Sequence, residues 1–273
     1  MLNGSDFKNN RSIRRNWISY SIKSAINLNV FELKVNGEHR SLTRAVNGEI
    51  SITFANPHQL MRRVDLYFPI LEGAWIKDLT VNGQVEPIQP PERKLLCLGD
   101  SITQGCLAIY PSRTYVNQVA EALPMDTINQ GVAGCTHIAA HLDGIETIPA
   151  PDLITIAYGT NDWFSTPSAE DIRQNIHDYY ERLNLAFPDV PMIVISPIWR
   201  ADMEEMRPGG EFAGIRKMIE EESAVWPNMS VIDGLSVSPH DCAYFGDEYL
   251  HPNDEGFTWM AEKLIPLLNV LKV

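Results

Sequence analysis

The sequence predicts an α/β fold, in which helices cover both faces of a parallel sheet, preceded by an all-β domain. Three observations predict it. Asn-Gly turns and short β-rich runs fill residues 1–90, whereas candidate strands and helices alternate over residues 91–273. Pro87, Pro90 and Pro91 stand between the two patterns and indicate a stiff linker. We therefore expect a domain boundary near residue 90.

Asn-Gly pairs mark the turns of the first domain. Asn36-Gly37, Asn47-Gly48 and Asn82-Gly83 each lie beside short apolar runs, and apolar residues partly alternate with others over residues 64–68. Asn-Gly is the strongest short hairpin signal, because both central residues of that turn need positive φ. Several short strands joined by such turns predict a β-sandwich of the jelly-roll kind over residues 1–90.

Five short β-rich runs are the expected strands of the second domain. They lie at 94–99, 126–129, 152–158, 191–196 and 230–233. β-Branched residues are common in them, and such residues suit a pleated, buried surface.

Helices are expected between these strands, and two are clearest. Over residues 168–187 apolar side chains recur at helical spacing, and Ser168 with Asp171 forms an N-cap signature. A last helix is expected from about Asn253 to Leu268. Alternation of strands and helices is typical of a parallel sheet between two helical layers.

Composition excludes some partners. The chain has 273 residues, 44% of them hydrophobic, and a formal net charge of −13. This apolar content is enough for a packed core. A strongly acidic surface repels phosphate backbones and anionic membranes, so we expect neither nucleic-acid binding nor membrane binding.

Targeting signals are not apparent. Residues 1–20 lack the apolar stretch of a secretory signal, and no window is long and apolar enough to span a bilayer. The four cysteines lack C-x-x-C spacing: Cys97, Cys106, Cys135 and Cys242. Reduced thiols and a cytoplasmic location are therefore expected.

The turn Gly99-Asp100-Ser101 carries the first chemical signal. It follows the expected strand 94–99 directly, and a new segment begins at once. Ligands of open α/β sheets bind at this carboxyl edge, close to helix N-termini that favour negative charge. Ser101 is therefore a candidate nucleophile. The plainer alternative is that Asp100 or Ser101 only caps a helix.

Three later segments add candidate partners: Asn129–Cys135, Tyr158–Asp162 and Gly246–Asn253. Glycines in the first let the backbone turn tightly and offer N–H groups to a ligand. Asn161, in the second, has an amide suited to an oxyanion, or it is a simple turn residue. His251, in the third, follows carboxylates and precedes a helix, which suits a general base.

Together the four segments resemble the blocks of the SGNH, or GDSL-type, hydrolase superfamily. The resemblance implies a flavodoxin-like α/β/α sandwich over residues 91–273 and a serine esterase that needs no metal or cofactor. It implies that Ser101 is the nucleophile and that His251 is the base. The oxyanion donors it implies are the N–H groups of Ser101 and Gly134 and the amide of Asn161.

The acidic partner of His251 departs from the family pattern. The family usually has Asp three residues before the histidine, whereas this chain has Glu248 there and Asp247 one residue earlier. Position favours Glu248 as the carboxylate that orients the imidazole, and Asp247 stays the alternative.

A second resemblance concerns the first domain. Residues 64–69 are similar to the Asp-Leu-Tyr core of the GxDLY-type domain that precedes some SGNH esterases, although Arg63 stands where that motif has glycine. Such a domain can narrow the cleft or hold a sugar. Tyr67 and Trp75 are its candidate substrate contacts, with core packing as the alternative.

A zinc site is not expected. His137 and His141 stand four residues apart on an expected helix, a spacing that can bind zinc. They lack the H-E-x-x-H pattern that would make this a metalloprotease-like site.

The expected substrates are short-chain esters, acetyl esters first, of small-molecule or carbohydrate alcohols. Two other functions stay open: acyl transfer by the same residues, and carbohydrate binding by a catalytically dead domain. Residues 196–214 are expected to form a surface loop or a rim of the pocket. Association into a homo-oligomer also stays open.

Overall fold

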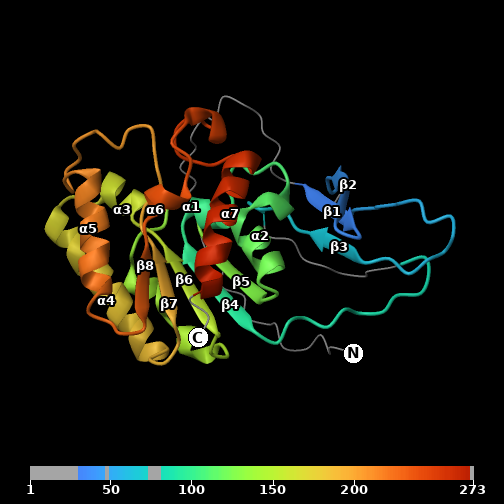
Figure 1. Ribbon diagram of the computed structural model, residues 1–273, viewed down its shortest axis with the longest axis horizontal. Coiled ribbons are helices and arrows are strands. Elements are labelled where there is room, and N and C mark those ends of the chain that lie inside the picture. Colours follow the sequence, from blue (N-terminus) through green and yellow to red (C-terminus); the bar gives the residue numbers. More distant parts are fainter. Residues whose placement is uncertain (1–29, 47–48, 73–80, 271–273) are drawn as a thin grey trace.

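A parallel sheet and a smaller antiparallel sheet organise the chain (Figure 1). The computed structural model describes residues 30–46, 49–72 and 81–270. Helices lie on both sides of the larger sheet, and the smaller sheet lies beside it, next to α2 (Figure 1).

The larger sheet confirms the expected strands. Its five strands are all parallel and have the order β5-β4-β6-β7-β8. They are β4 (Lys94–Gly99), β5 (Asp126–Gly131), β6 (Leu153–Ala157), β7 (Met192–Ile195) and β8 (Met229–Ile232).

Two apolar cores lie on the two faces of this sheet. Successive side chains of a strand point to opposite faces, so Leu95 and Cys97 join one core while Leu96 and Leu98 join the other. The helices are α1 (Ser101–Gln104), α2 (Tyr115–Ala122), α3 (Thr160–Ser165), α4 (Ala169–Ala186), α5 (Phe212–Ser223), α6 (Gly234–Val237) and α7 (Asp254–Val270). Helices α2 and α7 bury apolar residues in the first core, and α4 and α5 do so in the second.

The two expected helices are confirmed as α4 and α7. The Ser168 hydroxyl accepts the backbone N–H of Asp171 at 3.1 Å, as its N-cap signature predicted. Short 3-10 turns complete the regular structure: η1 (Pro111–Arg113), η2 (Ala139–Leu142), η3 (Ile145–Thr147) and η4 (Cys242–Tyr244). None of the described helices is both long and apolar enough to cross a membrane.

The smaller sheet is simpler than the expected sandwich. Strands β1 (Phe31–Val35), β2 (Glu38–Thr43) and β3 (Val64–Tyr67) pair antiparallel in the order β2-β1-β3. No second sheet of a sandwich occurs among the described residues of 30–90. The boundary near residue 90 stays a prediction.

Only one of the three Asn-Gly pairs forms the expected hairpin turn among the described residues. Asn36 and Gly37, with φ of 53° and 80°, form the expected turn between β1 and β2. Asn47-Gly48 and Trp75 lie outside the described residues. Asn82-Gly83 is a bend that no strand follows before β4. A hairpin turn can form without long-range partners, whereas the strands on either side of it cannot.

The small sheet contacts the α/β layer mainly through β1. Glu32 is buried and accepts hydrogen bonds from the Ser112 backbone N–H at 2.8 Å and hydroxyl at 2.9 Å. Lys34 Nζ lies 3.0 Å from Glu121 of α2, which also accepts a hydrogen bond from the Tyr67 hydroxyl. The Tyr67 hydroxyl therefore helps to hold the small sheet against α2.

Candidate active site

Ser101 begins α1 immediately after β4 ends. Its Oγ lies 2.8 Å from His251 Nε2, across 150 residues of chain. Gly99 makes the sharp turn possible, because a Cβ at that position would lie 2.0 Å from Thr103 Oγ1 and 2.9 Å from a backbone oxygen of β6. Asp100 caps α1 by accepting the Ile102 N–H at 2.9 Å. Asp100 therefore caps the helix while Ser101, which is buried, contacts His251.

His251 lies in the loop before α7, and a carboxylate holds its other ring nitrogen. Asp247 Oδ2 is 2.6 Å from His251 Nδ1. The second oxygen, Asp247 Oδ1, accepts the N–H groups of Tyr249, Leu250 and His251 at 3.0, 2.8 and 3.0 Å. Partial burial raises the pKa of Asp247, but hydrogen bonds from the His251 ring and from the backbone outweigh it and lower the pKa to about 2. Asp247 is therefore ionised at neutral pH.

The structure places Asp247, and not the Glu248 that position favours, against the His251 ring. The turn bends back on Asp247 Oδ1, and this brings Asp247, four residues before His251, against the imidazole. Glu248 has a left-handed backbone, with φ of 57°, and its side chain is exposed. Counting residues from the histidine cannot reveal a turn of this kind.

Asn161, on α3, lies between the turn that carries Ser101 and the loop that carries Gly134. Its amide nitrogen donates to the backbone oxygen of Cys135 at 3.0 Å and contacts Asp100 Oδ2 at 3.4 Å. Cys135 directly follows Gly134, and Asp100 directly precedes Ser101. The structure therefore brings three of the expected blocks together around α1. Gly134 is exposed and has φ of 80°, a conformation that favours glycine.

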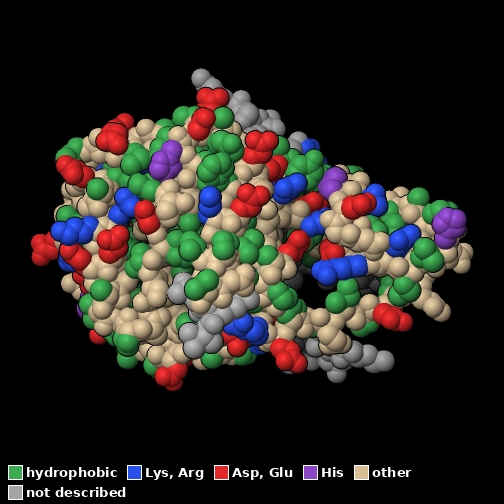
Figure 2. All heavy atoms as spheres, in the orientation of Figure 1, with side chains coloured by type: hydrophobic (Ala, Val, Ile, Leu, Met, Phe, Trp, Pro, Cys, Tyr) green, Lys and Arg blue, Asp and Glu red, His purple; other side chains and the backbone are tan. Residues whose placement is uncertain are grey.

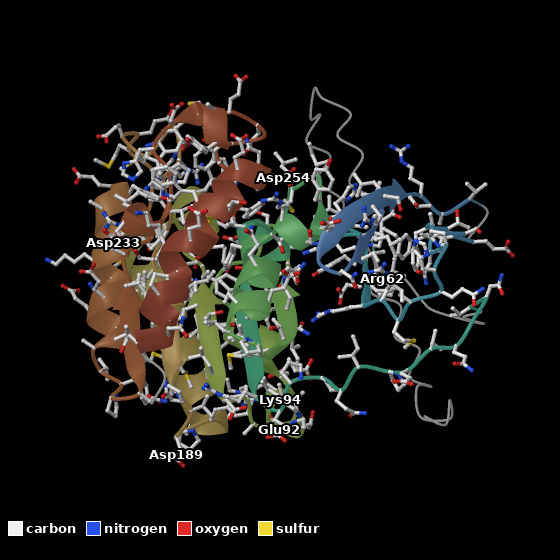
Figure 3. All side chains as sticks on the ribbon, turned by 45° about the vertical axis from the view of Figure 1, so that its right-hand side comes forward. Arg62, Glu92, Lys94, Asp189, Asp233 and Asp254 are labelled. Atoms are coloured by element: carbon white, nitrogen blue, oxygen red, sulfur yellow. The ribbon has the colours of Figure 1, made fainter. Side chains whose placement is uncertain are left out.

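The site lies at the carboxyl edge of the sheet. Figure 3 shows Lys94, the first residue of β4, and Asp254, the first residue of α7, toward opposite ends of the sheet. Ser101 follows the far end of β4 and His251 precedes α7, so both lie at the Asp254 end. Ligands bind at this edge in open α/β sheets.

A family comparison agrees with this geometry. Residues 97–259 match the model of the GDSL-like Lipase/Acylhydrolase family. The chain belongs to this family. The match includes each of the four GDSL-family segments named above and excludes the small sheet.

Solved structures show the same fold at low sequence identity. A salicylyl-acyltransferase from a tetracycline biosynthetic pathway has a TM-score of 0.68 at 19% identity, over 93% of this chain and 78% of that one. A carbohydrate esterase family 2 enzyme with a carbohydrate-binding domain, from Corynascus thermopiles (Myceliophthora fergusii), has a TM-score of 0.68 at 16% identity, over 89% and 86%. An acetyl xylan esterase from the rumen bacterium Butyrivibrio proteoclasticus has a TM-score of 0.63 at 17% identity, over 90% and 85%. No curated protein matches the chain by sequence.

A buried pair joins the loop that follows the segment Asn129–Cys135 to the segment Tyr158–Asp162. Asp162 Oδ1 accepts the His137 backbone N–H at 3.0 Å and lies 3.1 Å from His137 Nδ1. Both side chains are fully buried. Burial raises the pKa of Asp162, but the His137 charge and its hydrogen bonds outweigh this effect and lower the pKa. The pair fixes the loop after Gly134 to the helix that carries Asn161.

The sequence reading missed this role of His137. The 3-10 turn η2 begins at Ala139, so His137 and His141 do not share the expected helix. No group of three or more candidate metal ligands occurs in the described part of the chain. The signal available was its place three residues after Gly134, just beyond the segment Asn129–Cys135.

Gln104 was also missed. At the end of α1, its Oε1 accepts the Ala133 N–H at 2.9 Å, and its Nε2 donates to the Ile70 oxygen at 3.2 Å. Gln104 thus joins the residue before Gly134 to the segment that follows β3.

Proposed function

We propose that this protein is a serine esterase that hydrolyses short-chain esters through an acyl-enzyme at Ser101. One observation carries the proposal: the unbroken chain of contacts from Ser101 Oγ through the His251 ring to Asp247. Such a chain activates a hydroxyl that is otherwise a weak nucleophile. It also weighs against a catalytically dead binding protein.

The arrangement supports the following steps. The Asp247 carboxylate keeps the imidazole proton on Nδ1, which leaves Nε2 to accept the Ser101 proton as Oγ attacks the ester carbonyl. The imidazolium then returns the proton to the departing alcohol. Water, deprotonated by His251, attacks the acyl-enzyme and releases the acid and Ser101. Asp247 stabilises the imidazolium in both halves.

The oxyanion is proposed to bind at three N–H donors. They are the backbone groups of Ser101 and Gly134 and the side-chain amide of Asn161. The Asn161 amide donates one hydrogen to the Cys135 oxygen at 3.0 Å and lies 3.4 Å from Asp100 Oδ2 with the other, so the proposal requires the oxyanion to replace the longer contact. The backbone N–H groups of Ser101 and Gly134 are held by the fold, so they need little reorganisation when negative charge develops.

The proposed substrates are acetyl or other short acyl esters of polar alcohols, carbohydrates included. Two of the fold relatives are carbohydrate esterases by name, one of them an acetyl xylan esterase. The net charge of −13 argues against an anionic polymer as substrate. Acidic side chains are spread over the face shown in Figure 2 and do not gather in one patch.

We also propose the domain division and the location. Residues 1–90 form a separate domain of the GxDLY type, and residues 64–67 of its motif form β3. All four cysteines are free, which supports a reducing, cytoplasmic environment.

A series of p-nitrophenyl esters from acetate to decanoate, run beside acetylated sugars, tests the substrate proposal. We expect the highest kcat/KM on acetate and release of acetate from sugars. Activity that rises toward decanoate, with none on sugars, contradicts it. Ser101→Ala is the control for the mechanism: it should retain the circular dichroism spectrum of the parent and lose covalent labelling by a fluorophosphonate.

Acyl transfer is the second candidate, because a fold relative that spans 93% of this chain is an acyltransferase by name. It needs the same residues and differs only in the group that attacks the acyl-enzyme. Faster product formation with an added alcohol than with water alone would favour transfer over hydrolysis.

A further inference from the structure

The segment between β7 and α5 is a loop with many exposed residues, as expected, but part of it is buried. It contains Arg200, whose residue surface is only 1% exposed, and Asp202, which is also buried. A buried guanidinium is costly unless every donor finds a partner. The partners of Arg200 therefore show what holds it there.

Two donors of Arg200 reach the helix that carries Asn161. Arg200 Nη1 donates to the Thr160 hydroxyl at 2.9 Å and to the Thr160 backbone oxygen at 3.3 Å. Thr160 is the first residue of α3 and the direct neighbour of Asn161. The guanidinium thereby fixes the start of α3.

A third donor reaches the turn that carries His251. Arg200 Nη2 donates to the Tyr249 hydroxyl at 3.0 Å. Tyr249 lies between Asp247 and His251 in the chain, and its own N–H donates to Asp247 Oδ1 at 3.0 Å. Ala201, which follows Arg200, donates its backbone N–H to the backbone oxygen of Tyr249 at 2.9 Å. Both the side chain and the backbone of Tyr249 are thus held.

A carboxylate and aromatic rings hold the guanidinium itself. Asp202 accepts Arg200 Nε at 2.5 Å and Nη2 at 3.1 Å, and it also accepts the Tyr249 hydroxyl. The guanidinium carbon lies 4.8 Å from the Trp163 ring centroid and 5.3 Å from that of Tyr249. A planar, always charged fork that stacks on rings is a property of arginine and not of lysine.

We propose that Arg200 is a positioning residue of this site. One guanidinium holds the turn of His251 and the helix of Asn161 in register, so that the base and the oxyanion donor meet the same carbonyl. The proposal rests on the proposed esterase function. Reacting groups must be placed closely, since a misplacement of about 1 Å can cost on the order of 10²-fold in rate.

Three substitutions test the contact of Arg200 with Thr160 separately from its contact with Tyr249. Tyr249→Phe removes the hydroxyl that joins the turn to Arg200, Thr160→Val removes the hydroxyl on α3, and Arg200→Lys removes the fork. We expect Tyr249→Phe and Thr160→Val each to lower kcat about tenfold on p-nitrophenyl acetate, and Arg200→Lys to lower it about 10²-fold. KM should change by less than about twofold, because the bound substrate is not contacted.

The double variant provides the sharper test. If the hydroxyls of Thr160 and Tyr249 both act through Arg200, removing either one already disturbs the relative placement of His251 and Asn161. Combining Thr160→Val with Tyr249→Phe should then cost clearly less than the product of the two single effects. Losses that multiply overturn the proposal, because they indicate two independent contacts.

Two controls exclude a purely structural effect. Rates are normalised to the active sites counted by fluorophosphonate titration, and a loss explained by fewer active sites contradicts the proposal. Arg173→Lys is the matched control, since Arg173 joins α4 to Glu221 and Glu222 of α5 at 2.6 and 2.8 Å, apart from the site. It should leave kcat unchanged.

A readout without substrate separates this proposal from the proposed function. The proton between His251 Nδ1 and Asp247 should give a far-downfield proton NMR signal in the parent and in Arg173→Lys. We expect it to shift or broaden in Arg200→Lys and in Tyr249→Phe. An unchanged signal in both contradicts the positioning role even if no ester is hydrolysed. A parent that hydrolyses no ester contradicts the proposed function alone.

Discussion

The chemistry of single residues here depends on how the backbone turns. Asp247 and Glu248 are adjacent carboxylates, yet only Asp247 meets the imidazole, because its other oxygen accepts three successive N–H groups. A carboxylate held in this way keeps the imidazole in one tautomer and orientation.

This difference predicts opposite results for two matched substitutions. Asp247→Asn should lower kcat by about 10³-fold or more, because an amide at that position favours the wrong tautomer of His251. Glu248→Gln should change kcat by less than about threefold, in line with its exposure. Steady-state kinetics on p-nitrophenyl acetate decide between them. The reverse ranking would assign the orienting role to Glu248.

Residues near Ser101 show why sequence reading succeeds at some positions and fails at others. Ser101, Asn161 and His251 stand in short motifs at strand ends, and strand ends meet at one edge of a parallel sheet. His137 contacts Asp162, 25 positions away, and Arg200 contacts Thr160 and Tyr249, 40 and 49 positions away, outside any periodic pattern. Such pairings follow from tertiary packing, and no local rule predicts them.

At the scale of elements, local patterns predict the second part of the chain well and the first part poorly. The strands and helices after residue 94 follow from burial patterns and caps that each segment carries within itself. The first 90 residues depend on strand pairing, and β-propensity is set by neighbours as much as by the strand itself. Among the described residues there, only β1 to β3 pair as strands, beside an isolated bridge between Val46 and Glu49.

Close packing of α1 on the end of β5 makes a second prediction. A Cβ at Gly131 would lie 2.2 Å from the Gln104 backbone nitrogen, whereas a Cβ at Gly214, inside α5, meets nothing within 4 Å. Gly131→Ala should therefore destabilise the fold by about 1–3 kcal/mol or more and reduce activity, because backbone must move. Gly214→Ala should stabilise it by about 0.5–1 kcal/mol. Urea unfolding measures both, and equal stability of the two variants would refute the packing argument.

At the scale of the whole molecule, one buried carboxylate joins the small sheet to the α/β layer. Glu32 is 1% exposed and accepts both hydrogen bonds from Ser112. Glu32→Gln should lower the free energy of unfolding by about 1.5–3 kcal/mol, the range for hydrogen bonds to a charged group. Glu38→Gln, at an exposed ion pair with Arg40, should change it by less than about 0.5 kcal/mol. Guanidinium unfolding followed by fluorescence tests the pair, and equal effects would mean that Glu32 does not hold the sheet.

Asp100 should make the stability of the whole protein depend on pH. Burial raises its pKa to about 7, above its ordinary value of 3.8, despite the opposing hydrogen bond from the Ile102 N–H. Between these two pH values the folded state keeps a proton that the unfolded state has lost, so stability falls as pH rises through the window. The net charge of −13 adds self-repulsion over the same range.

Asp100→Asn separates the two effects, because the amide oxygen can still cap α1 while the side chain no longer titrates. Self-repulsion remains in both proteins, so the difference between their unfolding free energies reports Asp100. We expect that difference to move in favour of Asp100→Asn from pH 4 to pH 7, by no more than about 4 kcal/mol, since one pKa unit corresponds to about 1.4 kcal/mol. Urea unfolding at half-unit steps of pH measures it. Parallel curves for the two proteins would show that Asp100 ionises in the folded state as readily as in the unfolded chain.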